Sequence, residues 1–484
     1  MKILKDILKN IKTKKIVGKI DIEIHSICFD SREAKPQCIF VAVKGTKTDG
    51  HNYIEQCINA GATVIVCDVL PEILIENITY VLVEDSSFAL GIISSNFYDN
   101  PSSHIKVIGI TGTNGKTTTV NLLHDLFTGL GYKVGLLSTI ENKIGNKIIK
   151  STHTTPDSIE INRLLKEMLE QNCSYCFMEV SSHAIVQNRI AGIRFTGGIF
   201  SNITHEHLDY HKNFKEYLKA KKRFFDNLPS TAFAISNIDD KNGEIILQNT
   251  KASKYYYSLK QIADFKCRII ENRIEGLQIN INNNDVWVKL VGEFNAYNIL
   301  AVYGTAILLG EESIEILKIL STLEPVEGRF YHIKNKKNTT AIIDYAHTPD
   351  ALNNVLETIK SLKRPNSEII TVVGAGGDRD KSKRPIMAKI ACNLSNKVIL
   401  TSDNPRTEEP LNIIEDMKKG VEKKYIKNVL VISDREEAIK TACMLSNEGD
   451  VILIAGKGHE KYQEINGKKY PFDDKLILKK YFNN

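Results

Sequence analysis

The chain has 484 residues, 42% of them hydrophobic and 25% charged, a composition that is typical of a folded protein and excludes a disordered or fibrous one. A chain of this length is too long to fold around a single hydrophobic core, so we expect three domains. The net charge of +6 comes from 64 basic and 58 acidic residues scattered along the sequence, a balance that gives no indication of nucleic-acid binding.

The sequence lacks the patterns of export and membrane insertion. Residues 1–10 alternate apolar and charged positions at helical spacing, unlike a signal peptide. No segment approaches the roughly 18 uninterrupted apolar residues of a membrane-spanning helix. The nine cysteines are odd in number and dispersed along the sequence, which favours reduced thiols over disulfides. The close pair Cys173 and Cys176 runs into an apolar strand and is predicted to have a packing role. We therefore expect a cytoplasmic protein with no membrane insertion.

The first hundred residues predict a small α/β domain. Short apolar runs at 38–43 and 62–67 each end in Gly or Asp turn signals. A polar break at 100–103 separates them from the next apolar run. The N-terminal domain is therefore expected to span residues 1–103.

The middle of the chain predicts a mostly parallel sheet with helices on both faces. The apolar run 105–110 leads through a Gly-rich loop into a helical stretch, and 133–138 gives the next strand. The same order recurs, with apolar runs that end near Val180, Ser201 and Ser236. Residues 269–290 alternate instead and indicate a hairpin with its turn at 282–285. The central domain is expected to span residues 104–331.

A second α/β series follows Arg329 and predicts a Rossmann-like C-terminal domain over residues 332–484. The expected strands are 341–343, 368–373, 397–400 and 450–454. Each ends in a polar loop, and ligands of open α/β sheets bind at the carboxyl ends of strands. We therefore expect the chemistry of this domain in those loops.

A phosphate-binding loop is predicted at residues 111–118, Thr-Gly-Thr-Asn-Gly-Lys-Thr-Thr, between a strand and a helix. Such a loop wraps phosphates with backbone N–H groups, while Lys116 can reach the β- and γ-phosphates and the Thr117 hydroxyl can hold magnesium. Ile110 replaces the usual opening glycine, so the loop is a variant. The predicted ATP contacts of the loop are Gly112, Thr113, Asn114, Gly115, Lys116, Thr117 and Thr118.

This loop resembles the ATP loop of the Mur ligases and of their relative folylpolyglutamate synthase. Further motifs occur in the order found in diaminopimelate-adding Mur ligases: Glu-Val-Ser-Ser-His-Ala at 179–184, His-Glu-His-Leu-Asp-Tyr-His at 205–211, Asn-Ala-Tyr-Asn at 295–298, Glu-Gly-Arg-Phe at 327–330, Asp-Tyr-Ala-His-Thr-Pro-Asp at 344–350, Asp-Asn-Pro-Arg at 403–406 and Gly-Lys-Gly-His-Glu at 456–460. The resemblance covers nearly the whole chain and is weakest in the first 25 residues and the hairpin.

The resemblance implies an ATP-dependent acid–amino-acid ligase of peptidoglycan synthesis. Such an enzyme joins meso-diaminopimelate to the D-glutamate γ-carboxylate of UDP-N-acetylmuramoyl-L-alanyl-D-glutamate through an acyl phosphate, and releases ADP and phosphate. The transferring phosphoryl group needs cations around it. The resemblance implies a Mg²⁺ site at Thr117, Glu179, His207 and Lys221, with Lys221 carbamylated by carbon dioxide so that it becomes an anion. The implied catalytic residues are Lys116, Glu179, His207, Lys221 and Arg329.

The resemblance also implies the ligand contacts. Asn298, Arg329 and Asp344 would contact the nucleotide, Asp344 at the ribose hydroxyls and Arg329 at phosphate. The UDP-muramoyl dipeptide is expected at Ser31, Thr46, Lys47, Thr48, Thr154, Thr155, Ser181, Gln187 and Arg189, and His153 departs there from the more usual Asn or Leu. Diaminopimelate is expected at Arg379, Asp403, Asn404, Pro405, Arg406, Gly456 and Glu460.

Several alternatives stay open. Arg406 favours diaminopimelate because lysine lacks a second carboxylate, but an L-lysine- or lanthionine-adding ligase of the same family is close. Folylpolyglutamate synthase should lack the 403–406 segment and the uridine-binding first domain. A non-catalytic nucleotide-gated binding protein should have lost the metal groups, which are all present, and only the resemblance excludes a kinase. We expect ATP as co-substrate, Mg²⁺ as cofactor, small-molecule substrates, no nucleic acid, and a monomer.

Overall fold

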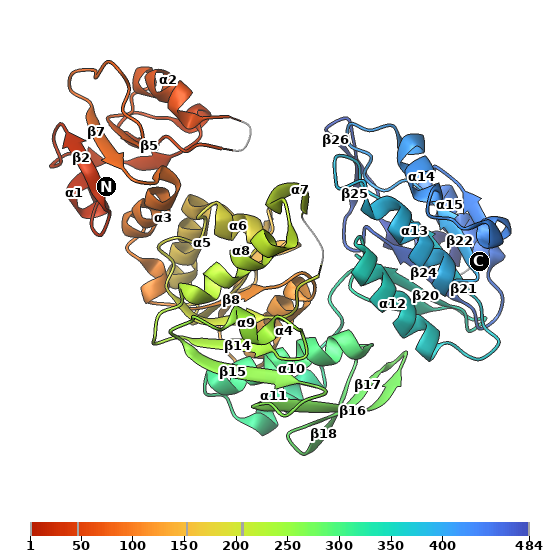
Figure 1. The fold of residues 1–484 in the computed structure, drawn as a ribbon. Helices are drawn as coiled ribbons and strands as arrows, with labels where there is room; N and C mark the ends of the chain where they lie inside the picture. The colour runs from red at the N-terminus through yellow and green to blue at the C-terminus, as the bar shows by residue number, and fades with distance from the viewer. Residues whose placement is uncertain (1, 46–47, 152, 205–207, 483–484) are drawn as a thin grey trace.

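The computed structural model describes residues 2–45, 48–151, 153–204 and 208–482. Its N-terminal part contains a five-stranded sheet in the order β2-β7-β6-β5-β4 (Figure 1). β4 to β7 are parallel, and β2 pairs with β7 antiparallel. One face packs on α1 and α3 and the other on α2. The strands are β2 (Thr13–Val17), β4 (Ser26–Cys28), β5 (Cys38–Val41), β6 (Val64–Cys67) and β7 (Thr79–Val83), with a separate antiparallel pair β1 (Lys2–Ile3) and β3 (Glu23–Ile24). The helices are α1 (Leu4–Ile7), α2 (Ile54–Asn59) and α3 (Ser86–Phe97).

The middle of the chain forms an eleven-stranded sheet in the order β11-β10-β9-β12-β8-β13-β14-β15-β16-β17-β18. The seven central strands, β9-β12-β8-β13-β14-β15-β16, are parallel. The antiparallel strands β10 and β11 extend one edge of the sheet, and β17 and β18 extend the other. The strands are β8 (Lys106–Thr111), β9 (Val134–Leu137), β10 (Glu141–Ile144), β11 (Lys147–Lys150), β12 (Tyr175–Glu179), β13 (Phe195–Phe200), β14 (Phe233–Asn237), β15 (Ser253–Ser258), β16 (Phe265–Arg273), β17 (Gly276–Ile281) and β18 (Asn284–Val288). The predicted hairpin is confirmed, because β17 and β18 enclose its turn.

Helices cover both faces of this sheet, as the sequence predicted. α4, α10 and α11 pack on one face, and α5, α6, α8 and α9 on the other. Cys176 is buried in β12, which confirms its packing role, and burial raises the pKa of its thiol. The helices are α4 (Lys116–Gly129), α5 (Ser158–Glu170), α6 (Ser182–Val186), α7 (Leu208–His211), α8 (Phe214–Asp226), α9 (Gly243–Ile246), α10 (Glu293–Leu308) and α11 (Ser313–Leu320).

The C-terminal part holds a six-stranded sheet in the order β19-β20-β24-β21-β22-β23, in which only the edge strand β19 is antiparallel. α12, α13 and α14 cover one face, and α15 and α16 the other, so the Rossmann-like prediction is confirmed. The strands are β19 (Tyr331–Lys334), β20 (Thr340–Asp344), β21 (Ile369–Val373), β22 (Lys397–Leu400), β23 (Val429–Val431) and β24 (Val451–Ala455), followed by the hairpin β25 (Tyr462–Ile465) and β26 (Lys468–Pro471). The helices are α12 (Pro349–Leu362), α13 (Lys383–Leu394), α14 (Pro410–Lys418), α15 (Arg435–Leu445) and α16 (Asp474–Phe482).

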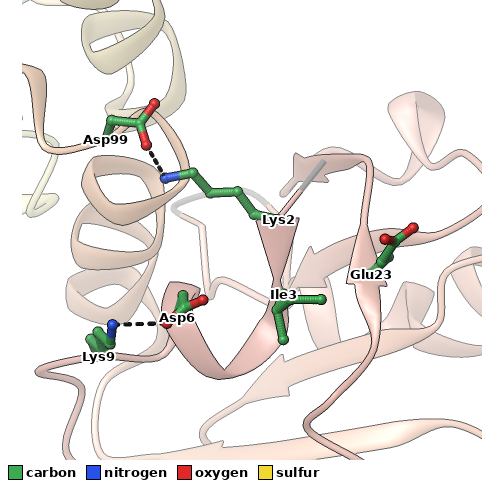
Figure 2. A pocket seen from close by; sticks show the side chains of 6 residues that line it. All are labelled: Lys2, Ile3, Asp6, Lys9, Glu23 and Asp99. Carbon is green, nitrogen blue, oxygen red and sulfur yellow. Dashed lines mark ion pairs between the residues drawn. The ribbon is translucent and has the colours of Figure 1, made fainter.

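The N-terminal sheet is attached to the central one through α3, which lies beside α5 (Figure 1). Gly91 of α3 also lets that helix approach the loop between α6 and β13, since a Cβ there would lie 2.5 Å from the Ala191 carbonyl oxygen. A surface pocket of about 480 Å³ adjoins this junction (Figure 2). Two ion pairs lie among its lining residues, Lys2 with Asp99 at 2.6 Å and Lys9 with Asp6 at 2.8 Å, and Lys166 of α5 lies 3.2 Å from the same Asp99 carboxylate (Figure 2). Asp99, at the edge of this pocket, therefore joins the N-terminal part to α5.

Among the described residues, no helix combines the length and the apolar character that crossing a membrane would require.

Candidate active site

A cleft of about 1030 Å³ lies between the central and C-terminal sheets, at the carboxyl ends of their parallel strands. The predicted residues that line it are Thr113, Asn114, Gly115, Lys116, Thr117, Thr154, Thr155, Glu179, Ser181, Gln187, Arg189, Arg329, Arg379, Asp403, Asn404, Arg406, Gly456 and Glu460. Those buried behind this lining are Gly112, Thr118, Lys221, Asn298, Asp344 and Pro405. The structure thus gathers the predicted ATP and amino-acid sites around one space.

The remaining predicted residues lie elsewhere. Ser31, at the start of a 3-10 helix, and Thr48, in a loop, belong to the N-terminal part and are not in the lining of the cleft. Thr46, Lys47 and His207 lie outside the described residues.

The phosphate loop joins β8 to α4, and neighbouring strands fix its shape. The backbone N–H of Thr113 donates to the Asn202 carbonyl at 2.8 Å, and that of Asn114 donates to Asn202 Oδ1 at 2.9 Å. Gly115 has a φ of +88°, and a Cβ there would lie 2.5 Å from Asn298 Oδ1. Glycine is required at this position by both the backbone conformation and the close approach of Asn298.

Two lysines converge on this loop. Lys116 Nζ donates to the carbonyl oxygens of Gly112 at 2.8 Å and Thr113 at 2.7 Å. Lys221, on α8, is 1% exposed, and its Nζ donates to the same Gly112 carbonyl at 2.7 Å. Its ammonium also lies 4.7 Å from the centre of the Tyr217 ring. Sequence alone could not distinguish Lys221 from its lysine neighbours on the helix, whereas the fold buries it at the loop.

Glu179 ends β12 beside the phosphate loop and is almost fully buried. Its Oε1 accepts from the Thr139 N–H at 2.8 Å, and Oε2 has no partner among the described residues. The Thr139 hydroxyl donates to Thr154 Oγ1 at 3.1 Å, and Arg329 Nη2 donates to Thr117 Oγ1 at 3.2 Å. A buried carboxylate oxygen without a donor is costly unless a cation or ligand meets it. Hard oxygen atoms of this kind fit Mg²⁺.

Within the described ranges no three His, Cys, Asp or Glu side chains form a metal-binding group.

One wall of the cleft carries the residues predicted to bind the muramoyl dipeptide. The backbone N–H of Ser181 donates to Thr155 Oγ1 at 3.0 Å. Arg189 donates through Nη1 to the Thr155 carbonyl at 2.8 Å and through Nε to Gln187 Oε1 at 2.9 Å. His153 lines the same wall, and burial together with the charge of Arg189 lowers the pKa of its imidazole. The wall thus presents hydroxyls, a cation and a neutral imidazole.

Arg329, in the link between the two sheets, lies close to Asp344 at the end of β20. The Arg329 guanidinium lies 4.6 Å from the centre of the Tyr345 ring. Asp344 ends β20, and its Oδ2 accepts from the Phe330 N–H at 2.7 Å. Burial raises the pKa of Asp344 to about 6, while the Arg329 charge opposes this rise. Asn114 of the phosphate loop also reaches across the cleft, where its Nδ2 donates to Asp350 Oδ2 at 2.8 Å.

The facing wall comes from the loops after β21, β22 and β24. Arg406 adopts a φ of +53°; its Nη1 donates to the Gly377 carbonyl at 2.7 Å, and its Nε lies 3.4 Å from Glu464 Oε2. Among the described residues, none accepts a hydrogen bond from Arg406 Nη2, and Arg379 has no hydrogen-bond or ion-pair partner. Asn404 Nδ2 donates to Glu460 Oε2 at 2.8 Å. This wall therefore offers two guanidinium groups and a carboxylate to a small ligand.

Two buried arginines hold these loops, and our sequence analysis missed both. Arg384 donates to Glu408 through Nη1 and Nη2 at 3.0 and 2.8 Å, to Asp416 at 3.0 Å and to the Gly376 carbonyl at 3.3 Å. Its side chain is fully buried. A signal was available, because Arg384 shares a helical stripe with the buried residues Met387, Ala388 and Ala391. An arginine on such a stripe needs buried partners.

The second arginine, Arg435, follows the same rule on α15. Its Nε and Nη2 donate to the two oxygens of Asp474 at 2.9 and 2.8 Å, and Nη2 also donates to the Ala455 carbonyl at 3.0 Å. Both charged side chains are fully buried. Arg435 precedes Ala438, Ile439 and Ala442 on the buried stripe of its helix. It ties the end of β24, and hence the loop that carries Glu460, to α16.

The fold and the site define a nucleotide-binding enzyme with three α/β units, in which a phosphate loop faces a small-ligand site. Residues 23–98 match the Mur ligase family catalytic domain, residues 110–306 the Mur ligase middle domain, and residues 328–458 the Mur ligase glutamate ligase domain. The chain belongs to the Mur ligase family, and it is accordingly an ATP-dependent amino-acid ligase.

Close relatives share the whole length of the chain. It is 56% identical to the UDP-N-acetylmuramoyl-L-alanyl-D-glutamate–2,6-diaminopimelate ligase of Cytophaga hutchinsonii over 98% of each protein, and 53% identical to that of Bacteroides fragilis over 99% of each. A solved diaminopimelate ligase structure superposes with a TM-score of 0.71 at 29% identity, covering 99% of this chain and 98% of the other. The MurF ligase from Thermotoga maritima in complex with ADP, at 20% identity and a TM-score of 0.61, covers 95% of this chain and 97% of the other and shares the fold.

Proposed function

We propose that this enzyme joins meso-diaminopimelate to the D-glutamate γ-carboxylate of UDP-N-acetylmuramoyl-L-alanyl-D-glutamate, with conversion of ATP to ADP and phosphate, in peptidoglycan synthesis. The observation that carries the proposal is the single cleft, in which a phosphate loop faces a wall with two arginines and a glutamate. Relatives named for this reaction are 52–56% identical over nearly the whole chain. Such ligation needs ATP, a carboxylate and an amine held in one place.

The phosphate-loop wall performs the first step. Lys116 already hydrogen-bonds to two carbonyl groups of the loop, so its ammonium group lies where phosphates would bind. Lys116 stabilises the charge on the phosphoryl group as it passes from ATP to the substrate carboxylate. In this proposal Arg329 contacts phosphate, and Asp344 and Asn298 hold the nucleotide. The product of this step is an acyl phosphate.

We assign Thr117, Glu179, His207 and Lys221 in its carbamate form as the groups that would hold Mg²⁺. The unpartnered oxygen of Glu179 supports this assignment. A bound Mg²⁺ would neutralise part of the phosphate charge. Carbamylation would turn the buried Lys221 from a donor to the loop into an anion.

The opposite wall binds the incoming amino acid. Arg379 and Arg406 hold the distal carboxylate of diaminopimelate, and Glu460 accepts from its distal ammonium, with Asp403, Asn404, Pro405 and Gly456 shaping the pocket. Two arginine forks suit a carboxylate. The free amine at the other end of the ligand attacks the acyl phosphate, and phosphate leaves. Lysine lacks the distal carboxylate and would leave the guanidinium groups unpaired.

The muramoyl dipeptide spans the remaining surfaces. Thr154, Thr155, Ser181, Gln187 and Arg189 bind its peptide part, and Ser31, Thr46, Lys47 and Thr48 bind its uridine part. This division follows three domains, which we place at 1–103, 104–331 and 332–484. We further propose that the enzyme is a cytoplasmic monomer.

The test is phosphate release in the presence of ATP, Mg²⁺ and the UDP-muramoyl dipeptide, with meso-diaminopimelate, lysine or lanthionine added separately. We expect the fastest release with diaminopimelate, together with a product whose mass equals the dipeptide plus diaminopimelate minus water. Reactions without an amino acid are the control. Turnover with lysine or lanthionine in preference to diaminopimelate, or stable release of a phosphorylated dipeptide without an amine, would refute the assignment.

A further inference from the structure

Lys457 is a buried cation behind the amino-acid wall that the proposed reaction leaves without a role. It follows β24 in the loop that ends at Glu460, and its side chain is 0% exposed. Its Nζ donates to Asn404 Oδ1 at 3.0 Å and to Glu460 Oε2 at 3.1 Å, and it lies 3.9 Å from Asp403 Oδ1. A fully buried lysine is rare unless it is paired, so these contacts fix its position.

The contacts of Lys457 orient two residues that line the cleft. Asn404 Oδ1 accepts from Lys457 and from the Glu464 N–H at 2.9 Å, so its amide nitrogen is turned toward Glu460. Glu460 Oε2 consequently accepts from both Asn404 and Lys457. Among the described residues no donor reaches Glu460 Oε1. One carboxylate oxygen is thus held from behind, and the other is left for a ligand.

We propose that Lys457 is a positioning residue for amino-acid recognition: it holds Glu460 so that one carboxylate oxygen meets the distal ammonium of the incoming amino acid. This inference rests on the proposed function. Lys457 also offsets the two buried acids Asp403 and Glu460, whose side chains are 8% and 15% exposed. Without that cation, both carboxylates would lose their shared lysine partner, and Glu460 would lose its anchor.

A positioning role and a purely structural role predict different substrate dependence. If Lys457 acts through Glu460, its loss affects only substrates that carry the distal ammonium. If it merely stabilises the loops, its loss also disturbs Arg406, whose backbone N–H donates to the Glu464 carbonyl at 3.0 Å. Recognition of the distal carboxylate would then fail as well.

The experiment compares wild type with Lys457→Met, using meso-diaminopimelate and 2-aminopimelate, which keeps the distal carboxylate but lacks the distal ammonium. For diaminopimelate, we expect KM to rise about tenfold or more, because one charge-assisted contact is lost. The kcat at saturation should change less than about threefold. For 2-aminopimelate, kcat/KM should change less than about twofold. The KM values for ATP and for the UDP-muramoyl dipeptide should not change, because they report on the other wall.

A double-mutant cycle supplies the second test. In a Glu460→Gln background, adding Lys457→Met should reduce diaminopimelate use by less than about twofold, because the residue through which it acts is already gone. Equal losses for both amino acids, or additive losses in the cycle, would overturn the positioning role. If thermal melting shows that Lys457→Met is unfolded, Lys457→Gln, which keeps a hydrogen-bond donor, takes its place in both tests. A wild type that does not use diaminopimelate refutes the proposed function instead, whatever the variants do.

Discussion

Replacing Arg406 by Ala should change the choice of amino acid more than it changes turnover. The side chain is 22% exposed, its Nη1 is engaged by the Gly377 carbonyl, and its Nη2 is left for a ligand among the described residues. One charge-assisted hydrogen bond contributes about 1.5–3 kcal/mol, and partial exposure favours the lower end of this range. We therefore expect kcat/KM for diaminopimelate to fall at least about tenfold.

Lysine serves as the internal control in this experiment, because it has no distal carboxylate to lose. Its kcat/KM should fall less or rise, so the ratio of the two specificity constants drops sharply. Arg406→Lys is the matched variant, which keeps the charge but loses the planar fork. Arg406 already has a left-handed backbone, so Ala adds little new strain. An unchanged ratio, or a wild type that prefers lysine, would show that Arg406 has another role.

Three further perturbations probe the rest of the site. Lys116→Met should lower kcat by roughly 10²–10³-fold without a change in thermal midpoint, since its charge acts on the transferring phosphoryl group; near-normal turnover of the folded variant would contradict this role. The pKa of Asp344 is about 6, so its carboxylate becomes protonated as pH falls through that value, and the KM for ATP should rise between pH 7 and pH 5. This rise should be absent in Asp344→Asn. A wild-type KM that does not change with pH would argue against the ribose contact. Arg384→Met removes a fully buried guanidinium from Glu408 and Asp416, whose side chains are 17% and 25% exposed, and should cost about 1.5–3 kcal/mol of unfolding free energy at pH 7, measured by urea titration. Arg384 holds the pKa of Glu408 at about 2, below its ordinary 4.5, so this stabilisation is present above pH 4.5 and is lost as pH falls toward 2; a stability gap independent of pH would contradict the pairing.

Much of the fold could be predicted because hydrophobic periodicity is local. The expected strand at 341–343 is β20 (Thr340–Asp344), and the expected turn at 282–285 separates β17 from β18. The antiparallel pair β10 and β11 was not predicted, although Gly145-Asn146 between alternating residues is a hairpin signal. Its strands are four residues long, too short to show a clear period beside the strong pattern of the parallel core.

The site was less predictable, because its geometry depends on residues far apart in sequence. The phosphate loop could be identified from its own residues, since its chemistry lies in consecutive backbone N–H groups. By contrast, the contact between Asn114 and Asp350 joins positions 236 residues apart. The burial of Lys221 against Gly112 likewise depends on how α8 packs on the sheet. Resemblance to the family supplied the candidates, and only the fold places them around one cleft.

The two walls of the cleft are held in different ways, and this difference separates specificity from turnover. The amino-acid wall is fixed within one sheet by buried charges, with Arg384 bound to the Gly376 carbonyl and Arg435 to the Ala455 carbonyl. Across the cleft, hydrogen bonds between polar side chains connect the two sides, such as Arg329 with Thr117 and Asn114 with Asp350. Polar interfaces between domains permit relative motion, whereas buried ion networks are rigid. Substitutions inside the wall should therefore alter which amino acid is used, and substitutions across the cleft should alter how fast the bound substrates react.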